Sequence, residues 1–178
     1  PDVIAEVSQL LKRLLGEKID YYVQHDRNLG AVRADPQQLE QVIMNLAVNA
    51  RDAMQMNAIK RGKQDWKGRL TLATRRVSAR DVRKMGIDIM PADDYTVLIV
   101  EDNGGGIPAD VLPKLFEPFF TTKDEGMGIG LSTCRSLIQA QGGDIGFERP
   151  EGGGACFYFT LPVAGAQGSP CAPDGKPA

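Results

Sequence analysis

The sequence predicts an α+β fold, a two-layer α/β sandwich with helices on one face of a mixed, mainly antiparallel sheet. Three observations predict it: helical periodicity in three separate segments, short apolar runs between them, and a glycine-rich turn before the last run. Helices and sheets bury their apolar faces against one another, and two layers achieve this. The chain has 178 residues, enough for one domain with a substantial core. Residues 1–163 are predicted to form this domain. Residues 164–178, rich in Ala, Gly, Pro and Ser, are predicted to be a disordered linker or tail.

Local signals predict the elements in order. They are a helix over residues 3–15, strands over 19–24 and 31–34, a helix from Pro36 to about Met56, an exposed basic loop over 57–68, strands over 70–74 and 96–100 with a long charged connection over 75–94 between them, a helix over 129–141, and strands over 145–148 and 156–161. Asp35 is predicted to cap the second helix, with Gln38 at the capping-box position. The strand over 96–100 is almost wholly apolar, which predicts a central place in the sheet.

Composition narrows the classes of function. Lys and Arg number 21 and Asp and Glu 23, so the charge balance does not call for nucleic acid or an anionic membrane as a partner. No apolar run approaches the ~20 residues that span a bilayer, so we expect a cytoplasmic location without direct membrane contact, any anchor lying outside this sequence. Cys134, Cys156 and Cys171 lack metal-ligand spacing and predict reduced thiols, two of them in the core.

Two asparagines, Asn45 and Asn49, interrupt an otherwise apolar helix. Their spacing of four places both on one face. Asparagine is a poor helix former and is costly to bury without partners. One interpretation is a hydrogen-bonded structural pair. The other is a cation site, because a carboxamide oxygen is a hard, neutral ligand suited to Mg²⁺.

Three further segments have patterns typical of ligand sites. Residues 102–106 (Asp-Asn-Gly-Gly-Gly) follow the apolar strand and predict either a plain turn or a place where a flat group approaches the backbone. Residues 126–132 (Gly-Met-Gly-Ile-Gly-Leu-Ser) open the third helix, where backbone N–H groups and the helix dipole favour phosphate, although the P-loop signature is missing. Residues 116–123 (Phe-Glu-Pro-Phe-Phe-Thr-Thr-Lys) predict either a small apolar cluster or a hinge with a phosphate-facing tip.

In order and spacing, these four segments resemble the N, G1, F and G2 boxes of the catalytic domain of sensor histidine kinases. That family belongs to the gyrase, Hsp90, histidine kinase and MutL superfamily. The resemblance covers about residues 1–162; residues 45–54 and 116–123 look like alphaproteobacterial hybrid cell-cycle kinases, and residues 126–143 look more like oxygen- and nitrogen-sensing kinases. It implies a Bergerat-type ATP-binding fold, ATP and Mg²⁺ as cofactors, and transfer of the γ-phosphate to a histidine on a separate dimerisation domain. A response regulator or receiver domain would then accept the phosphoryl group.

The resemblance also implies a role for individual residues. Asn49 would be the Mg²⁺ ligand, with Asn45 close to the phosphates, and Lys123 would hold the triphosphate as the third catalytic residue. Asp102 would accept a hydrogen bond from the exocyclic amine of adenine, with Gly104 and Gly106 making room for the ring. The other residues implied to line the nucleotide site are Ile107, Phe120, Thr121, Thr122, Gly126, Met127, Gly128, Ile129, Gly130 and Leu131.

One departure bears on the reaction. Gyrase-like and Hsp90-like relatives carry a glutamate one turn before the Mg²⁺-binding asparagine, where it activates water, whereas this sequence has Asn45. An amide cannot act as a general base, so we expect ATP to bind well and to be hydrolysed poorly. This disfavours an ATPase of the same superfamily, and the four intact boxes disfavour a pseudokinase. An anti-sigma-factor-type kinase stays open, because the residues upstream would decide it.

Two features lie outside the four boxes. His25, the single histidine, follows a predicted strand without a long amphipathic helix, so it is predicted to be a surface residue and not the phosphoacceptor. The loop over residues 60–67 holds the single tryptophan, Trp66, among four cations. It predicts either a solvated insertion or a docking surface for an anionic regulator, a stacked nucleotide or a partner domain.

Overall fold

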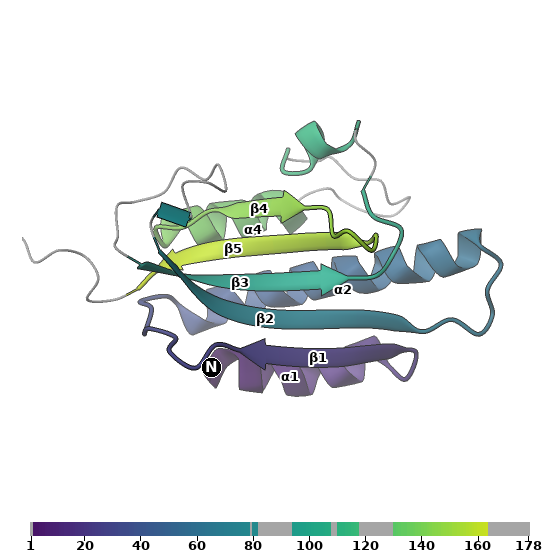
Figure 1. Ribbon diagram of the computed structural model, residues 1–178, viewed down its shortest axis with the longest axis horizontal. Coiled ribbons are helices and arrows are strands. Elements are labelled where there is room, and N and C mark those ends of the chain that lie inside the picture. The colour runs from purple at the N-terminus through teal and green to yellow at the C-terminus, as the bar shows by residue number, and fades with distance from the viewer. Residues whose placement is uncertain (1, 79, 82–93, 108–109, 118–129, 164–178) are drawn as a thin grey trace, which may run out of the picture.

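The computed structural model describes residues 2–78, 80–81, 94–107, 110–117 and 130–163 (Figure 1). The described elements are the helices α1 (Asp2–Leu15), α2 (Pro36–Lys60) and α4 (Gly130–Ala140), the 3₁₀ turn η1 (Leu112–Lys114), and the strands β1 (Ile19–His25), β2 (Gly68–Ser78), β3 (Asp94–Asp102), β4 (Ile145–Glu148) and β5 (Ala155–Pro162). The strands form one sheet in the order β1-β2-β3-β5-β4, and the three helices lie behind it in the view of Figure 1. β1 pairs parallel with β2, and the other pairings are antiparallel. The predicted fold class is therefore confirmed.

The hydrophobic core fills the space between the sheet and the helices. Alternate side chains of each strand point to the helices, as the period of two in a strand requires. β3 lies between β2 and β5, so its predicted central place is confirmed. The largest fully buried side chains of the core include Leu11, Ile43, Leu46, Leu70, Leu72, Ile138 and Phe159. Cys134 and Cys156 are buried free thiols, as predicted, and Cys171 lies outside the described residues.

Three predicted boundaries are wrong. Residues 31–34 form no strand but a single bridge, Val32 to Val163. Helix α2 continues four residues past Met56 to Lys60, because its last turns still bury apolar side chains, Met54 and Ala58. β2 continues to Ser78, well into the predicted connection, because its last residues pair with β3 while their charged side chains stay exposed. The remainder of that connection and the predicted tail, residues 82–93 and 164–178, lie outside the described residues.

The start of α2 is capped partly by a residue that follows α4. Asp35 accepts a hydrogen bond from the backbone N–H of Gln37 at 2.9 Å, so its N-cap role is confirmed. The capping-box role predicted for Gln38 is wrong, because the backbone N–H of Asp35 donates instead to Oε1 of Gln141 at 3.0 Å. The side chain of Gln141 also donates to Oε1 of Gln38 at 3.1 Å. A residue just after α4 thus completes the cap, a contact that local sequence spacing cannot show.

Among the side-chain contacts that join α2 to α4 and to Gln141 after it, two have a common spacing. The first is the contact between Gln38 and Gln141, and the second is between Nδ2 of Asn45 and Sγ of Cys134 at 3.7 Å. From Gln38 to Asn45 is seven residues (45 − 38), and from Cys134 to Gln141 is also seven (141 − 134). The numbers rise on α2 as they fall on α4, so the helices run antiparallel. Four residues further, at one more turn, the same register would place Gly130, at the start of α4, level with Asn49 on α2.

Among the described residues, no helix is both long and apolar enough to cross a membrane.

Candidate functional site

A buried carboxyl group stands at the end of the central strand. Asp102 is the last residue of β3, and only 4% of its surface is exposed. Its carboxylate accepts hydrogen bonds from the backbone N–H of Gly104, at 2.8 Å, and from that of Ala155. Burial raises the pKa of Asp102 to about 6, although the two backbone hydrogen bonds lower it. A buried acid with a raised pKa, held in a glycine-rich loop, is a candidate for ligand recognition.

The loop that follows Asp102 packs closely against α2. A Cβ atom on Gly104 would lie 3.2 Å from the backbone nitrogen of Met54 and 3.3 Å from the carbonyl carbon of Ala53. A Cβ atom on Gly105 would lie 3.2 Å from Oδ1 of Asn57. The chain at Gly104 therefore touches the backbone of α2, which gives that glycine a packing reason beside the one that the resemblance implies.

The same loop is also held by the sheet and by the hairpin that joins β4 to β5. Oδ1 of Asn103 accepts a hydrogen bond from the backbone N–H of Arg69 on β2, at 2.8 Å. Gly106 has a φ of +74°, which favours glycine, and a Cβ atom there would lie 3.0 Å from the carbonyl oxygen of Gly154. The guanidinium of Arg149 donates to the carbonyl oxygen of Ile107 at 3.0 Å. Residues 102–107 are thus fixed by three neighbouring elements.

The predicted asparagines lie on the helix that this loop touches. Asn45 and Asn49 are half-buried on α2, and Ala53, next to Gly104, is one turn beyond Asn49. Asn45 also contacts α4 through Cys134. The structure therefore brings the Asp102 loop against α2, and Asn45 on the same helix against Cys134 of α4.

Some of the predicted site can be placed and some cannot. Gly130 and Leu131 are the first two residues of α4, where unpaired backbone N–H groups and the helix dipole favour an anion. The predicted site residues that lie outside the described part of the chain are Phe120, Thr121, Thr122, Lys123, Gly126, Met127, Gly128 and Ile129.

Sequence reasoning missed two residues that shape this site. Ala155 donates its backbone N–H to Asp102, and Gly154 has a φ of +90°. A Cβ atom on Gly154 would lie 2.0 Å from the carbonyl oxygen of Asp102, so no other residue fits without a shift. The signal in the sequence is the Gly152-Gly153-Gly154 run, which predicts a hairpin turn but not a contact with Asp102.

His25 lies where the sequence predicted it. It ends β1 with its side chain exposed, and its Nδ1 lies 2.6 Å from Oγ1 of Thr74 on the neighbouring strand. It is therefore a strand-end surface residue.

Comparison with known proteins identifies the family of this chain. Residues 34–165 match the family described as "Histidine kinase-, DNA gyrase B-, and HSP90-like ATPase". The chain belongs to this family of ATP-binding domains.

The relatives that it resembles are sensor kinases. Sensor kinase CckA of Brucella abortus is 46% identical over 163 residues, which cover 90% of this chain and 16% of CckA. Sensor protein FixL of Bradyrhizobium diazoefficiens is 40% identical over 140 residues, covering 78% of this chain and 23% of FixL. The chain thus spans less than a quarter of these two relatives.

Solved structures agree. The nucleotide-free catalytic domain of histidine kinase ThkA superposes with a TM-score of 0.65 at 30% identity, over 90% of each chain. Full-length ShkA in complex with AMPPNP has a TM-score of 0.66 over 90% of this chain and 29% of ShkA; at 24% identity this likeness shows the fold alone. The resemblance to sensor histidine kinase catalytic domains is therefore confirmed.

Proposed function

We propose that this chain is the ATP-binding catalytic domain of a sensor histidine kinase, working in the cytoplasm. It would donate the γ-phosphate of ATP to a histidine on a separate dimerisation domain, for relay to a response regulator. The observation that carries this proposal is that α2 carries Asn45 and Asn49, touches the loop after buried Asp102, and contacts α4 at Cys134. One end of this site suits a base, and the other suits phosphates.

The base end would be Asp102 and its glycine-rich loop. An ionised Asp102 can accept a hydrogen bond from the exocyclic amine of adenine, while guanine would present a carbonyl oxygen to the same carboxylate. A repelled, unpaired polar contact costs roughly 1–3 kcal/mol, or about ten- to a hundredfold in affinity. The loop is already held in place by its neighbours, so little ordering would oppose binding.

The phosphate end would lie between α2 and α4. Gly130 and Leu131 open α4 and offer backbone N–H groups, and Asn45 is one turn from the level of Gly130. The same end would include Lys123 and the other residues of the F and G2 boxes that the resemblance implies.

Mg²⁺ fits the donors on this side of the site. Mg²⁺ is usually bound through one or two protein groups together with substrate phosphates and water. Asn49 would offer a neutral carboxamide oxygen level with the start of α4. Among the described residues, no group of three His, Cys, Asp or Glu side chains could hold a metal ion, so the proposal gives Mg²⁺ a single protein ligand and leaves the rest to the nucleotide. When bound, Mg²⁺ would neutralise charge on the phosphates, and Asn49 would fix its position.

Calorimetry with ATP and GTP tests the assignment of the base end. ATP is expected to bind about ten- to a hundredfold more tightly than GTP. Equal affinities would refute the role of Asp102.

The complex of histidine kinase ThkA with response regulator TrrA, 28% identical to this chain with a TM-score of 0.61, supports a response regulator as the downstream partner.

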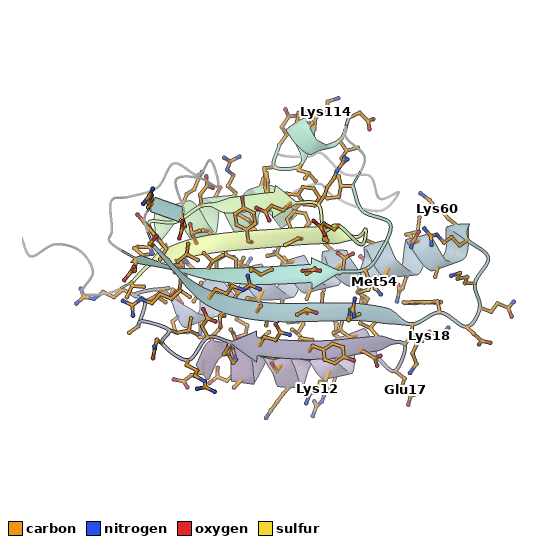
Figure 2. All side chains as sticks on the ribbon, in the orientation of Figure 1. Lys12, Glu17, Lys18, Met54, Lys60 and Lys114 are labelled. Carbon is orange, nitrogen blue, oxygen red and sulfur yellow. The ribbon has the colours of Figure 1, made fainter. Side chains whose placement is uncertain are left out.

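A second part of the proposal concerns the basic loop. Helix α2 projects beyond the sheet and carries Lys60 at its end, and Lys18 lies at the same end of the molecule (Figure 2). Nζ of Lys18 lies 5.8 Å from the ring centroid of half-buried Trp66, and Ile59 is 73% exposed. We propose that residues 60–67 bind an anionic regulator, because they carry four cationic side chains and because Lys18 lies over the ring of Trp66.

Trp66 makes this second part testable, because it is the only tryptophan in the chain. An oligoglutamate peptide serves as an anionic probe. Titration is expected to change the fluorescence of Trp66, and the change should disappear in the Lys60→Glu/Lys63→Glu variant and in about 1 M salt, where the Debye length is only ~3 Å. An unchanged signal in the parent chain would instead identify the loop as a solvated insertion.

A further inference from the structure

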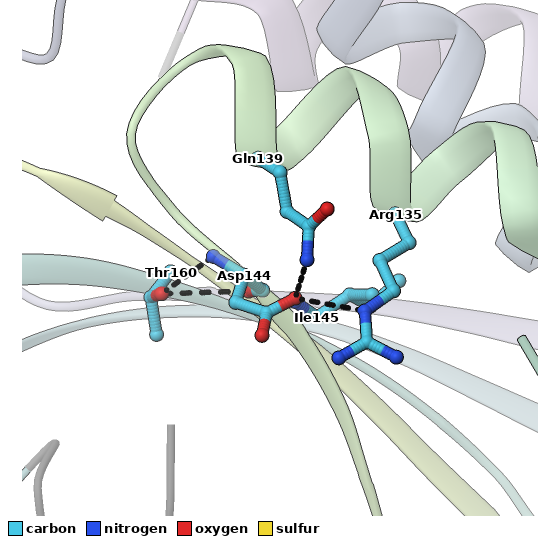
Figure 3. Close-up of polar contacts among 5 residues, drawn as sticks. All are labelled: Arg135, Gln139, Asp144, Ile145 and Thr160. Carbon is cyan, nitrogen blue, oxygen red and sulfur yellow. Dashed lines mark hydrogen bonds and ion pairs between the residues drawn. The ribbon is translucent and has the colours of Figure 1, made fainter. Parts of the chain in front are cut away.

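Arg135 connects α4 to two other parts of the molecule. Its Nε lies 3.3 Å from Oδ1 of Asp144, between α4 and β4 (Figure 3). Its guanidinium carbon lies 5.3 Å from the ring centroid of Phe116, in the stretch that follows η1. The function proposed above uses neither contact.

The carboxylate that holds Arg135 is itself fixed. Figure 3 shows Asp144 accepting from Nε2 of Gln139, at 3.4 Å, and from the backbone N–H of Ile145, at 2.8 Å. Its main chain is bound to Thr160 on β5, whose backbone N–H donates to the carbonyl oxygen of Asp144 at 2.9 Å. Asp144 is buried while Arg135 keeps part of its side chain in solvent. Nε of Arg135 is buried without a hydrogen-bond partner among the described residues, so this fixed carboxylate holds the guanidinium by charge.

The aromatic partner of Arg135 is fixed on its other side. Phe116 packs edge-on against Phe157 of β5, with ring centroids 6.5 Å apart, and Phe157 packs against Phe147 of β4 at 5.2 Å. Arg135 therefore lies between an anchored carboxylate and an anchored ring. A cation over an aromatic ring within about 6 Å is attracted to it.

We propose, on the basis of the function proposed above, that Arg135 is a positioning residue for the phosphate end of the nucleotide site. It acts through Phe116. Arg135 lies one turn after Leu131 at the start of α4, and its guanidinium holds the stretch around Phe116 against this helix. The base end does not depend on this contact. Asp102 and its loop are held by α2, β2 and the β4–β5 hairpin, through contacts that do not include Arg135.

This division predicts that Arg135 affects ATP and adenosine differently. In Arg135→Met the long apolar stem remains and the cation is lost. Affinity for ATP, measured by calorimetry with Mg²⁺, is expected to fall about three- to tenfold, while affinity for adenosine stays within about twofold. Arg135→Lys keeps the cation and should recover most of the ATP affinity. Arg76→Met is the matched control, because Arg76 pairs with Asp94 at 2.7 Å, at the opposite end of β3 from Asp102.

Three further variants separate positioning from simple loss of structure. Arg135→Met leaves the carboxylate of Asp144 without its cation, so Arg135→Met/Asp144→Asn removes both charges and should show the same selective loss for ATP. Phe116→Leu should reproduce that loss, and its combination with Arg135→Met should add little, because both changes break one contact.

The possible outcomes separate the inference from the proposed function. Equal losses for ATP and adenosine would make Arg135 merely structural and overturn the inference, as would unchanged affinities or fully additive effects of the Arg135 and Phe116 changes. If the parent chain binds no ATP, the proposed function fails, and the inference fails with it. If the parent chain binds ATP and Arg135→Met binds it equally well, the inference fails alone.

Discussion

At the scale of single residues, Asp102 combines a cost in stability with a function. The carboxyl group is buried at the end of β3, and its pKa is raised from 3.8 to about 6. A pKa that is higher in the folded chain than in the unfolded chain means that folding favours the protonated form. The stabilising contribution of this group is therefore complete below about pH 4 and is lost as the pH rises through about 6. At neutral pH, the ionised group destabilises the fold.

Asp102→Asn should therefore stabilise the protein and impair it at the same time. Asparagine keeps an oxygen for the N–H groups of Gly104 and Ala155 but carries no charge. At pH 7.5 urea denaturation should show a gain of about 1–3 kcal/mol in the free energy of unfolding, which vanishes near pH 4. ATP should bind at least about tenfold more weakly, because the charge-assisted hydrogen bond is lost. A variant less stable than the parent at every pH would contradict this account.

Asn49 should affect the binding of Mg²⁺ and not the recognition of adenine. Asn49→Ala is expected to weaken ATP binding about tenfold in the presence of Mg²⁺ and by less than about twofold in EDTA, because a ligand to the cation is lost while Asp102 is unchanged. Calorimetry in both buffers measures the difference. Asn57→Ala, on the same helix two turns away, is the control and should lose no Mg²⁺ dependence. Equal losses in both buffers would identify Asn49 as a structural residue.

At the scale of elements, the junction between α4 and β4 depends on one glycine. A Cβ atom on Gly143 would lie 1.6 Å from the carbonyl oxygen of Thr160, a backbone atom that cannot move aside. Gly143→Ala is expected to lower the free energy of unfolding by about 3 kcal/mol or more, measured by urea denaturation. Gly152→Ala is the control: nothing lies within 4 Å of its Cβ position, so the change should be small. Similar free energies of unfolding for the two variants would show that the backbone at the junction relaxes.

Local signals predicted which helices and strands form better than they predicted the residues at which these elements end. The N-cap at Asp35, the central β3 and the helix that ends before Gly142 follow from residues close in sequence, and the structure confirms them. The ends of α2 and β2 were wrong because burial and strand pairing extended both beyond their local signals. The cap by Gln141 joins residues 106 positions apart, which no spacing rule reaches.

The candidate site divides in the same way. Asn45 and Asn49 could be found from the sequence because they interrupt an apolar helix, and Asp102 because it ends an apolar strand and precedes a glycine run. Gly154 and Ala155 could not, because their roles depend on which backbone lies beside Asp102 in the folded chain. The level of Gly130 relative to Asn49 likewise follows from helix packing and not from spacing.

At the scale of the whole molecule, the chain belongs to a family of ATP-binding domains, and its sequence contains one histidine. It spans 16% of CckA, and its one histidine is a strand-end surface residue. Phosphoryl transfer depends on placing the acceptor in line with the γ-phosphate, and that placement supplies several kcal/mol of the barrier.

We therefore expect the isolated chain neither to label itself from γ-labelled ATP nor to hydrolyse ATP appreciably. A cognate dimerisation domain added in trans should become labelled on its histidine, but inefficiently, since the tether that raises effective concentration is missing. Autoradiography and phosphate release measure the two activities. Acid-labile labelling of the chain alone that His25→Gln abolishes would contradict the assignment of His25. Brisk hydrolysis without labelling would favour an ATPase.

The contacts Gln38–Gln141 and Asn45–Cys134 determine how α4 can move relative to α2. Seven residues at 1.5 Å each place the contacts about 10 Å apart, with the packed core between them as a fulcrum. Sliding α4 along α2 would break both contacts at once, whereas tilting it opens one as it closes the other. With the pivot midway, about 5 Å from each contact, a displacement of about 1 Å at the Asn45–Cys134 contact corresponds to a tilt of roughly 11°. A push on the start of α4 would therefore be felt, reversed in direction, at Gln141 and the cap of α2, on the far side of the fulcrum from Asn49.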